Sequence, residues 1–360
     1  MTIPNGRSRI ADLTHLLEER GVDAMFVTHL PDIRWAVGFT GSNALLVVRP
    51  DESHLLTDGR YTTQARDEVV GATVHVPANG LVKHVAETCL LGDARTVLLQ
   101  AEHVNLAERD RWTGLLPGVT FESEEHLLVE RVAVKDEVAI AAVRRAQALT
   151  CSIFEDLLPD IRPGVTERDL AAEIVVRHLR GGASAMSFEP IVAAGARGAR
   201  PHARPSDAQI CAGDLVVIDM GGVVDGYCAD LTRTVAVGEP GAEARAAYTA
   251  VQRAQRAGLD ALHAGVMGSA VDAAARAVLE AAGLGEWFTH SLGHGVGMEV
   301  HEWPRLSQQV EHRLPAGATV TVEPGVYIPD RFGIRIEDLV VVREGGMENL
   351  TPLGTDLLVL

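Results

Sequence analysis

The segment Leu215–Thr234, with the sequence LVVIDMGGVVDGYCADLTRT, decides the fold of the second half of this 360-residue chain. Its first apolar run ends at Asp219, glycines then turn the chain, and a second β-prone run begins around Asp230. The distance between the two acids along the chain suits a hairpin. The segment therefore predicts a strand pair that brings both carboxylates to the same end.

The same plan recurs near the C-terminus. The apolar run TVTVEPG, Thr319–Gly325, delivers Glu323, and the run GIRIED, Gly333–Asp338, delivers Glu337 after a glycine and proline turn. Two hairpins built alike predict a pseudo-symmetric pair of half-domains with four acids pointing into a shared centre.

The stretch His290–Glu302, HSLGHGVGMEVHE, lies between the two predicted hairpins. Its glycines permit close backbone approach, and its histidines offer a neutral nitrogen ligand. Four clustered carboxylates repel one another unless they hold protons or bind cations, and two divalent ions would supply the matching charge. Oxygen donors with one imidazole favour harder ions such as manganese.

Taken singly, these residues have ordinary structural interpretations. An acid such as Asp219 at a strand end is usually a turn former, Glu323 before Pro-Gly suits a solvated turn, and His290 suits a satisfied core position. Four acids in two matching hairpins around a glycine- and histidine-rich stretch are much harder to explain in that way. The joint pattern predicts a metal site.

The rest of the chain predicts two domains, residues 1–130 and 131–360. In the first domain, strands at 24–28, 35–39, 44–48 and 96–100 alternate with helical segments, which indicates a compact α/β domain. The second opens with a long helix over 136–158, and Thr166 and Asp169 form the pattern of a capping box for the next helix. Further helices are expected at 243–264 and 269–282.

Composition excludes several classes of function. The formal net charge of −17 disfavours a nucleic-acid partner. No apolar run is long enough to span a membrane, and the N-terminal residues do not have the pattern of a secretory signal. The four cysteines are isolated, which favours reduced thiols and a cytoplasmic location.

Four blocks of this sequence resemble those of the pita-bread metallopeptidases, family M24, which includes aminopeptidase P, prolidase and methionine aminopeptidase. The blocks are IDMGGVVDGYCADLTRT, HSLGHGVGMEVHE, VEPGVYI and GIRIED. The resemblance implies an α+β pita-bread catalytic domain and two divalent metal ions, manganese foremost, with zinc or cobalt as alternatives. The five ligands that it implies are Asp219, Asp230, His294, Glu323 and Glu337, with Asp230 and Glu337 bridging both ions.

The N-terminal half resembles the creatinase-like domain of aminopeptidase P and prolidase. Ile33–Ser42 and Asp58–Tyr61 carry this resemblance, with Trp35 where relatives more often have tyrosine. It implies an α/β creatinase-like N-terminal domain in front of the pita-bread domain, and a homodimer. Methionine aminopeptidases lack a domain of this size. Creatinase shares the fold but works without metal, and the intact ligand set argues against that assignment.

The resemblance also implies roles outside the metal ligands. His202, in the loop PHARP at 201–205, and His301 would stabilise the oxyanion, while Glu323 would move a proton from water to the leaving nitrogen. His290, His301, Tyr327 and Arg335 form the expected substrate-binding set, with Arg335 orienting a ligand carboxylate.

These features predict a two-metal peptidase that hydrolyses the Xaa-Pro bond at the N-terminus of dipeptides or short peptides, its partner being a small peptide with proline in second position. Arg197, Arg200 and Arg204 are candidates for holding the C-terminal carboxylate of a dipeptide, and the choice between prolidase and aminopeptidase P stays open. Two alternatives remain: a hydrolase or lyase acting on a non-peptide substrate with the same scaffold, and a non-catalytic pita-bread binding module. Loss of metal ligands would mark the binding module, and none is lost.

Overall fold

The computed structural model describes residues 6–360, and the chain divides into two compact units. The first unit ends at Val132 and the second is Ala133–Leu360. No helix within residues 6–360 is both long and apolar enough to cross a membrane.

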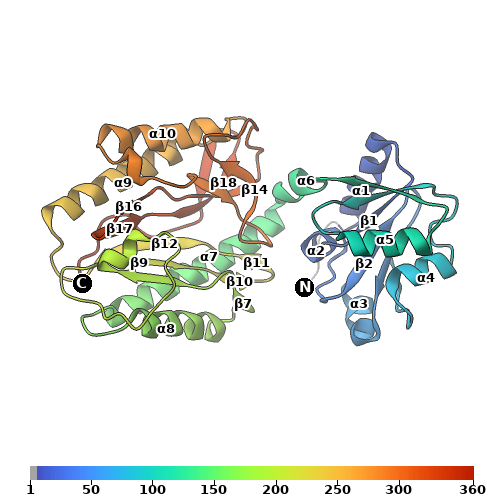
Figure 1. Ribbon diagram of the computed structural model, residues 1–360, viewed down its shortest axis with the longest axis horizontal. Helices are drawn as coiled ribbons and strands as arrows, with labels where there is room; N and C mark the ends of the chain where they lie inside the picture. Colours follow the sequence, from blue (N-terminus) through green and yellow to red (C-terminus); the bar gives the residue numbers. More distant parts are fainter. Residues whose placement is uncertain (1–5) are drawn as a thin grey trace. The chain divides into compact units, whose positions relative to one another are not determined.

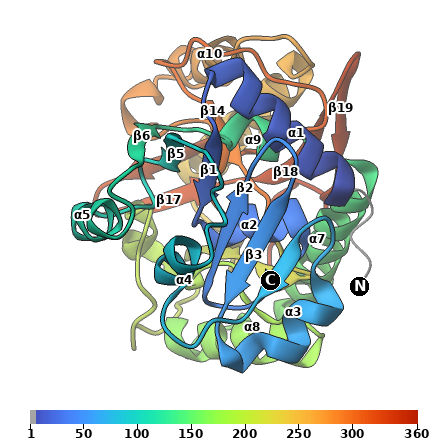
Figure 2. The same cartoon turned by 90° about the vertical axis from the view of Figure 1, so that its right-hand side faces the viewer.

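The first unit contains a six-stranded mixed sheet in the order β4-β3-β2-β1-β5-β6 (Figure 2). Its elements are α1 Gly6–Arg20, β1 Ala24–Val27, α2 Leu30–Val37, β2 Ala44–Val48, β3 Ser53–Thr57, α3 Thr62–Glu68, β4 Thr73–His75, α4 Leu81–Glu87, β5 Thr96–Gln100, α5 Leu106–Leu115 and β6 Thr120–Glu124. Alternate strand residues such as Phe26 and Val47 pack with Val85 of α4 and Trp112 of α5. All of residues 24–27 and 45–48 are buried, so the remaining residues of these strands are covered on the other face of the sheet.

The strand expected at 35–39 is wrong. Residues Leu30–Val37 form helix α2, with Pro31 in its first turn and Gly38 at its C-terminal cap in the left-handed conformation (φ 89°). A short apolar run does not by itself distinguish a strand from a buried helix, and the proline and glycine at its two ends decide for the helix.

The second unit has two helix pairs on opposite sides of its strands (Figure 1). Its helices are α7 Glu137–Leu157, α8 Glu167–Arg180, α9 Ala242–Ala261 and α10 Gly268–Ala281, and α6 Val129–Ala133 spans the junction of the two units. The capping box of α8 is confirmed, because the Thr166 side chain accepts from the backbone of Asp169 while the Asp169 side chain accepts from that of Thr166.

The strands of the second unit form several small antiparallel sheets, of which β12-β9-β8 and β14-β13-β15-β18-β19 are the larger. The strands are β7 Ala185–Met186, β8 Ile191–Ala194, β9 Leu215–Met220, β10 Gly222–Val224, β11 Tyr227–Cys228, β12 Leu231–Ala236, β13 Gly293–Gly295, β14 Glu302–Leu306, β15 Thr319–Val322, β16 Gly325–Ile328, β17 Phe332–Arg335, β18 Asp338–Arg343 and β19 Gly346–Asn349.

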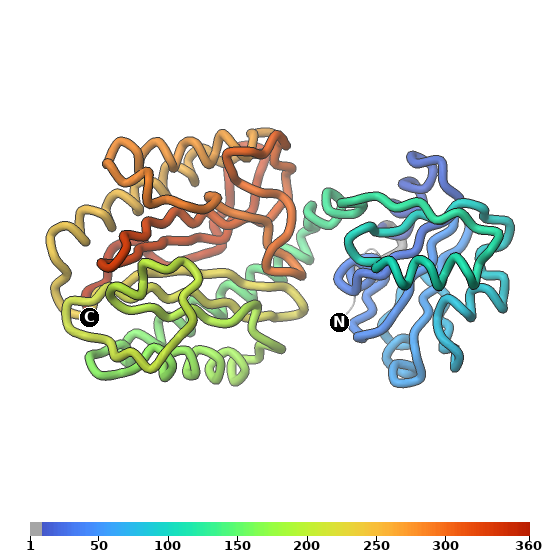
Figure 3. The backbone as a smooth tube through the Cα atoms, in the orientation of Figure 1, coloured from blue at the N-terminus to red at the C-terminus, as the bar shows by residue number. Residues whose placement is uncertain are grey.

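The first predicted pair of acid-bearing strands is antiparallel but is not a simple hairpin. The second prediction is partly wrong, because the run 333–338 lies mainly in β17, which pairs with β16, and reaches the partner strand of β15 only at Asp338. Strand β9 pairs with β12, and the small hairpin β10–β11 is inserted between them. Strand β15 pairs with β18, and the hairpin β16–β17 is inserted in the same way (Figure 3). The two paired regions lie side by side, since the Thr234 hydroxyl on β12 donates to the carbonyl oxygen of Arg335 on β17.

A candidate two-metal centre

A cavity of about 400 Å³ opens in the second unit, where the strands of the two paired regions meet. All ten residues predicted as metal, catalytic or substrate-binding groups line it: His202, Asp219, Asp230, His290, His294, His301, Glu323, Tyr327, Arg335 and Glu337. The acids come from the strand ends, where the apolar runs that precede or follow them are buried in the core.

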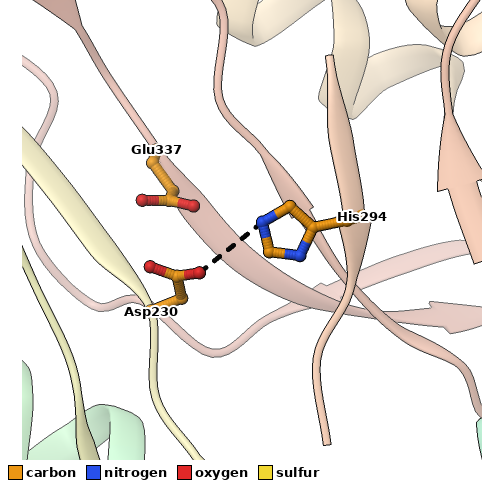
Figure 4. Close-up of side chains that lie close together, drawn as sticks. All are labelled: Asp230, His294 and Glu337. Atoms are coloured by element: carbon orange, nitrogen blue, oxygen red, sulfur yellow. Dashed lines mark ion pairs between the residues drawn. The ribbon is translucent and has the colours of Figure 1, made fainter. Parts of the chain in front are cut away.

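Three of these side chains converge closely (Figure 4). Asp230, His294 and Glu337 are buried, and one ligand atom from each lies within 4.8 Å of the others. The His294 Nε2 atom is 3.7 Å from Asp230 Oδ2 and 3.2 Å from Glu323 Oε1. The imidazole therefore faces acids from both paired regions.

A backbone carbonyl oxygen fixes the orientation of the His294 ring on the side away from the acids. Its Nδ1 lies 3.0 Å from the carbonyl oxygen of Gly295, which only accepts hydrogen bonds. Nδ1 therefore donates to the backbone, and Nε2 is the ring atom that faces the acids. This is the arrangement in which a metal-binding histidine donates its other N–H to the protein.

Arg335 ties the acids together from β17. Its guanidinium donates to Asp219 Oδ2 at 2.7 Å and to the Thr232 hydroxyl at 3.0 Å. That hydroxyl donates in turn to Glu337 Oε2 at 2.8 Å. The buried guanidinium of Arg335 thus orients the Asp219 carboxylate directly and the Glu337 carboxylate through the hydroxyl of Thr232.

The same arginine continues into the predicted substrate-binding set. It donates to the Tyr327 hydroxyl at 2.7 Å, and that hydroxyl lies 3.0 Å from His290 Nε2. His290 Nδ1 is 2.8 Å from the carbonyl oxygen of Ser291, so Nδ1 donates and Nε2 accepts from Tyr327. Burial is the main cause that lowers the pKa of His290 and raises that of Tyr327 to about 12, so both groups are neutral.

The four acids differ in charge. Burial raises the pKa of Asp219, and burial together with the neighbouring carboxylates raises those of Asp230 and Glu337 well above the usual range. Burial alone would also raise the pKa of Glu323, but the hydrogen bond and charge of His294 outweigh it and lower that pKa to about 2. Without cations, the surroundings of three of the acids therefore disfavour their ionised form.

The residues fit a pair of divalent ions. Asp219 Oδ1 is buried and has no hydrogen-bond partner, so one acceptor in the cavity is unsatisfied by protein. Four carboxylates and one imidazole form the oxygen-rich donor set that suits harder divalent ions. Two such ions would balance the negative charge of the ionised carboxylates, which burial otherwise disfavours.

The two remaining histidines lie at the cavity wall. The ring of His301 meets that of His294 edge to face, with centroids 4.4 Å apart. Desolvation by the surrounding protein, with the neighbouring His294 and Arg305, lowers the pKa of His301 to about 4, although part of the residue reaches solvent. His202 is exposed to the same cavity.

Of the three arginines considered for a substrate carboxylate, only Arg204 lines the cavity. Arg197 instead donates to Glu167. The sequence reasoning missed Arg305, which also lines the cavity at β14. Its place four residues after His301 was the available signal, because that spacing keeps it close to the histidine-bearing loop.

Comparison with known proteins gives two family matches. Residues 141–344 match the model of metallopeptidase family M24, and residues 9–132 match the creatinase/prolidase N-terminal domain. The chain is 34% identical over 352 residues to the uncharacterized peptidase YqhT of Bacillus subtilis, covering 98% of this chain and 100% of that protein.

Solved structures resemble the whole chain. An Xaa-Pro dipeptidase from Bacillus anthracis superposes with a TM-score of 0.96 at 33% identity, covering 99% of this chain and 100% of the other. An X-Pro aminopeptidase from Thermotoga maritima gives a TM-score of 0.90 at 35% identity, covering 95% and 99%. The resemblance therefore extends through both units.

Proposed function

The chain belongs to metallopeptidase family M24 and carries a creatinase/prolidase N-terminal domain, and from this premise we propose that it hydrolyses Xaa-Pro bonds at the N-terminus of dipeptides or short peptides. The observation that carries the proposal is the buried group of four carboxylates and one imidazole, with Asp219 Oδ1 left without a partner, in a cavity of about 400 Å³. Similar proteins are named for activity on Xaa-Pro peptides.

The proposed metal ligands are Asp219, Asp230, His294, Glu323 and Glu337, with Asp230 and Glu337 shared between two ions. Bound divalent ions polarise a carbonyl group and lower the pKa of water. Manganese is the proposed metal, because carboxylate oxygens outnumber the single nitrogen donor.

Glu323 is the proposed proton carrier. Its pKa of about 2 leaves it ionised at neutral pH, so it carries no proton of its own; in the proposed role it would accept a proton from water and pass it to the leaving nitrogen. The Thr321 hydroxyl, 3.2 Å from Glu323 Oε1, helps to hold the carboxylate in place.

His202 and His301 are the proposed stabilisers of the developing oxyanion. With a pKa of about 4, His301 is neutral at pH 7, so it would offer a neutral N–H rather than a positive charge. His290 and Tyr327 form the proposed wall of the proline pocket. The nitrogen of an Xaa-Pro bond has no hydrogen, so this wall needs no acceptor for it.

The proposal extends to assembly and location. We propose a homodimer in a reducing, cytoplasmic compartment. All four cysteines are free, two of them exposed, which favours a reducing environment. Sedimentation equilibrium of the purified chain tests the dimer.

Initial rates on Ala-Pro, Ala-Pro-Ala and Ala-Ala test the function. The protein is stripped of metal and assayed with and without manganese. Manganese-dependent cleavage of Ala-Pro alone identifies a dipeptidase, and preference for Ala-Pro-Ala an aminopeptidase. If none is cleaved while two metals are bound, the scaffold serves another substrate and the peptidase proposal falls.

A further inference from the structure

Glu167 is a fully buried acid outside the cavity. It is the first residue of α8 and has a relative exposure of 0%. It does not line the cavity, and the proposed mechanism does not use it. A buried carboxylate at this position needs hydrogen-bond donors, since an unsatisfied buried charge is costly.

The donors to Glu167 come from the two ends of one segment, residues 194–206. Glu167 Oε1 accepts from the backbone N–H of Ala194 at 3.0 Å. Glu167 Oε2 accepts from both the backbone N–H and the hydroxyl of Ser206, at 3.0 and 2.7 Å. One side chain thus closes a loop of thirteen residues, Ala194 to Ser206, at its base.

Arg197 extends the same attachment into the loop. Its Nε donates to both oxygens of Glu167 at 2.9 Å, and its Nη2 donates to the carbonyl oxygen of Arg204 at 2.7 Å. Arg204 lines the cavity, and so does His202, two residues before it. Glu167 is therefore connected through Arg197 to the part of the loop that faces the substrate.

The middle of the loop rests on β17, which carries Arg335. A Cβ atom on Gly333 would lie 1.8 Å from the carbonyl oxygen of Gly198, so the two backbones touch directly. Arg335 Nη1 donates to the carbonyl oxygen of Pro201 at 3.3 Å. His202 follows Pro201, so it lies between the contact with β17 and the closure at Glu167.

We propose that Glu167 is a positioning residue that holds the loop 194–206, and with it His202, against the cavity. This inference rests on the proposed function, because it assigns Glu167 an effect on catalysis through His202. A buried acid that served only to stabilise α8 would act on stability without acting through that histidine. The two roles make different predictions.

Glu167→Gln tests the proposal with little change in size. One carboxylate oxygen is replaced by an NH₂ group, which cannot accept the hydrogen bonds that the N–H groups of the loop donate to it. The loop should therefore be released at one or both ends. A misplacement of about 1 Å costs on the order of 100-fold in rate, so kcat/KM for Ala-Pro should fall roughly 10- to 100-fold, mainly through kcat. Bound metal should remain at the wild-type level.

A double-mutant cycle with His202→Ala decides between the two roles. If Glu167 acts through His202, the double variant loses little beyond His202→Ala alone. If the losses multiply, the positioning role is wrong. Glu173→Gln is the matched control, because Glu173 lies on the same helix and pairs with Arg177 at the surface.

A second variant guards against misfolding of Glu167→Gln. Arg197→Met removes the link from the loop side, at a residue whose side chain is 29% exposed, and should reproduce the loss in kcat. Hydrogen exchange of residues 194–206 needs no substrate and should speed up in both variants. Unchanged exchange and unchanged kcat/KM would overturn the inference, whereas faster exchange in a protein that cleaves no Xaa-Pro peptide would overturn only the proposed function.

Discussion

The two halves of the second unit use one arrangement twice. Helices α7 and α8 precede β8, β9 and β12, and helices α9 and α10 precede β13, β15 and β18. The correspondence extends to the backbone hydrogen bonds just before the second helix of each half. In the first half, the N–H of Gly164 donates to the carbonyl oxygen of Ile210, and the N–H of Ile210 donates to that of Val165. In the second half, Gly265 donates to Leu314, and Leu314 donates to Val266, in the same way. Each half then delivers two of the four proposed ligand acids to the same cavity.

The halves differ in what accompanies those acids. The second half adds His294 and Arg335, and only its Glu323 has a lowered pKa. The acids of the first half, Asp219 and Asp230, both have raised pKa values. The repeated scaffold thus provides symmetric positions, while the imidazole and guanidinium of one half make those positions chemically unequal.

The largest effect should come from two single variants, each of which removes one proposed ligand acid from one of the two halves. Asp230→Ala and Glu337→Ala should each abolish hydrolysis and reduce bound metal below two ions per chain, because both are proposed to bridge the ions. Activity and metal content by atomic spectroscopy are the measurements. Asp225→Asn, in the inserted hairpin β10–β11, is the control. If either alanine variant retains both full activity and two metals, the proposed site is wrong.

Arg335 of the second half donates directly to an acid of the first half, so its loss tests the asymmetry itself. Arg335→Met removes the donor to Asp219 Oδ2, while Asp219 Oδ1 already has no hydrogen-bond partner. Groups that orient metal ligands contribute roughly 10- to 100-fold to activity or metal affinity, and a loss of that size is expected. Arg331→Met, an exposed arginine beside the same strand, is the control. Losses of equal size in the two variants would show that the buried position has no special role.

The raised pKa values predict that metal binding releases protons. A raised pKa means that Asp219, Asp230 and Glu337 hold their protons to a higher pH than usual and that a cation must compete with those protons, so affinity should fall as the pH falls, up to about tenfold per pH unit for each proton released. Titration calorimetry with Mn²⁺ at pH 6 and 8, in buffers of different ionisation heat, measures that release. Binding without proton uptake by the buffer would contradict the assignment.

The same pKa shifts set the sign of a stability effect. An acid whose pKa is raised by folding contributes stability that is fully present below its unfolded value, about 4, and is lost as the pH rises through the folded value. The metal-free protein should therefore lose part of its stability as the pH rises above about 4. The increase in Tm caused by manganese should be larger at pH 8.

The sequence predicted the acids and the histidine stretch because their signals are local. Asp219 ends an apolar strand and Glu323 precedes Pro-Gly, and such positions are visible without knowledge of the fold. The inserted hairpins were missed, because β10–β11 is short and its pairing with β7 depends on a distant segment.

The acids that support the loops could not be recognised from sequence. Glu167 lies in the first turn of a helix, where acids are common because they interact favourably with the helix dipole. Its burial depends on donors 27 to 39 residues away. Asp272, in α10, gave no signal for the same reason, since its backbone donor Leu292 lies 20 residues further along the chain, beyond the end of the helix.

The smallest expected effect comes from Asp272, which supports a histidine loop in the second half as Glu167 does in the first. Asp272 is fully buried and accepts from the backbone N–H of Leu292 at 3.0 Å and from Arg276 Nε at 2.9 Å. Arg276 donates in turn to the carbonyl oxygen of His290 at 3.0 Å. The attachment therefore reaches the proposed proline pocket.

Asp272→Asn should lower kcat/KM less than tenfold, because His290 stays fixed by Tyr327 and by the carbonyl oxygen of Ser291. The loss of a hydrogen bond to a charged group, about 2 kcal/mol, should lower the Tm by about 5 °C in a unit of this size. Steady-state kinetics on Ala-Pro and thermal unfolding measure the two effects, with Asp260→Asn on α9 as a surface control. A loss in kcat as large as that of Glu167→Gln would mean that both halves position catalytic groups equally, and that the asymmetry is confined to the metal ligands and Arg335.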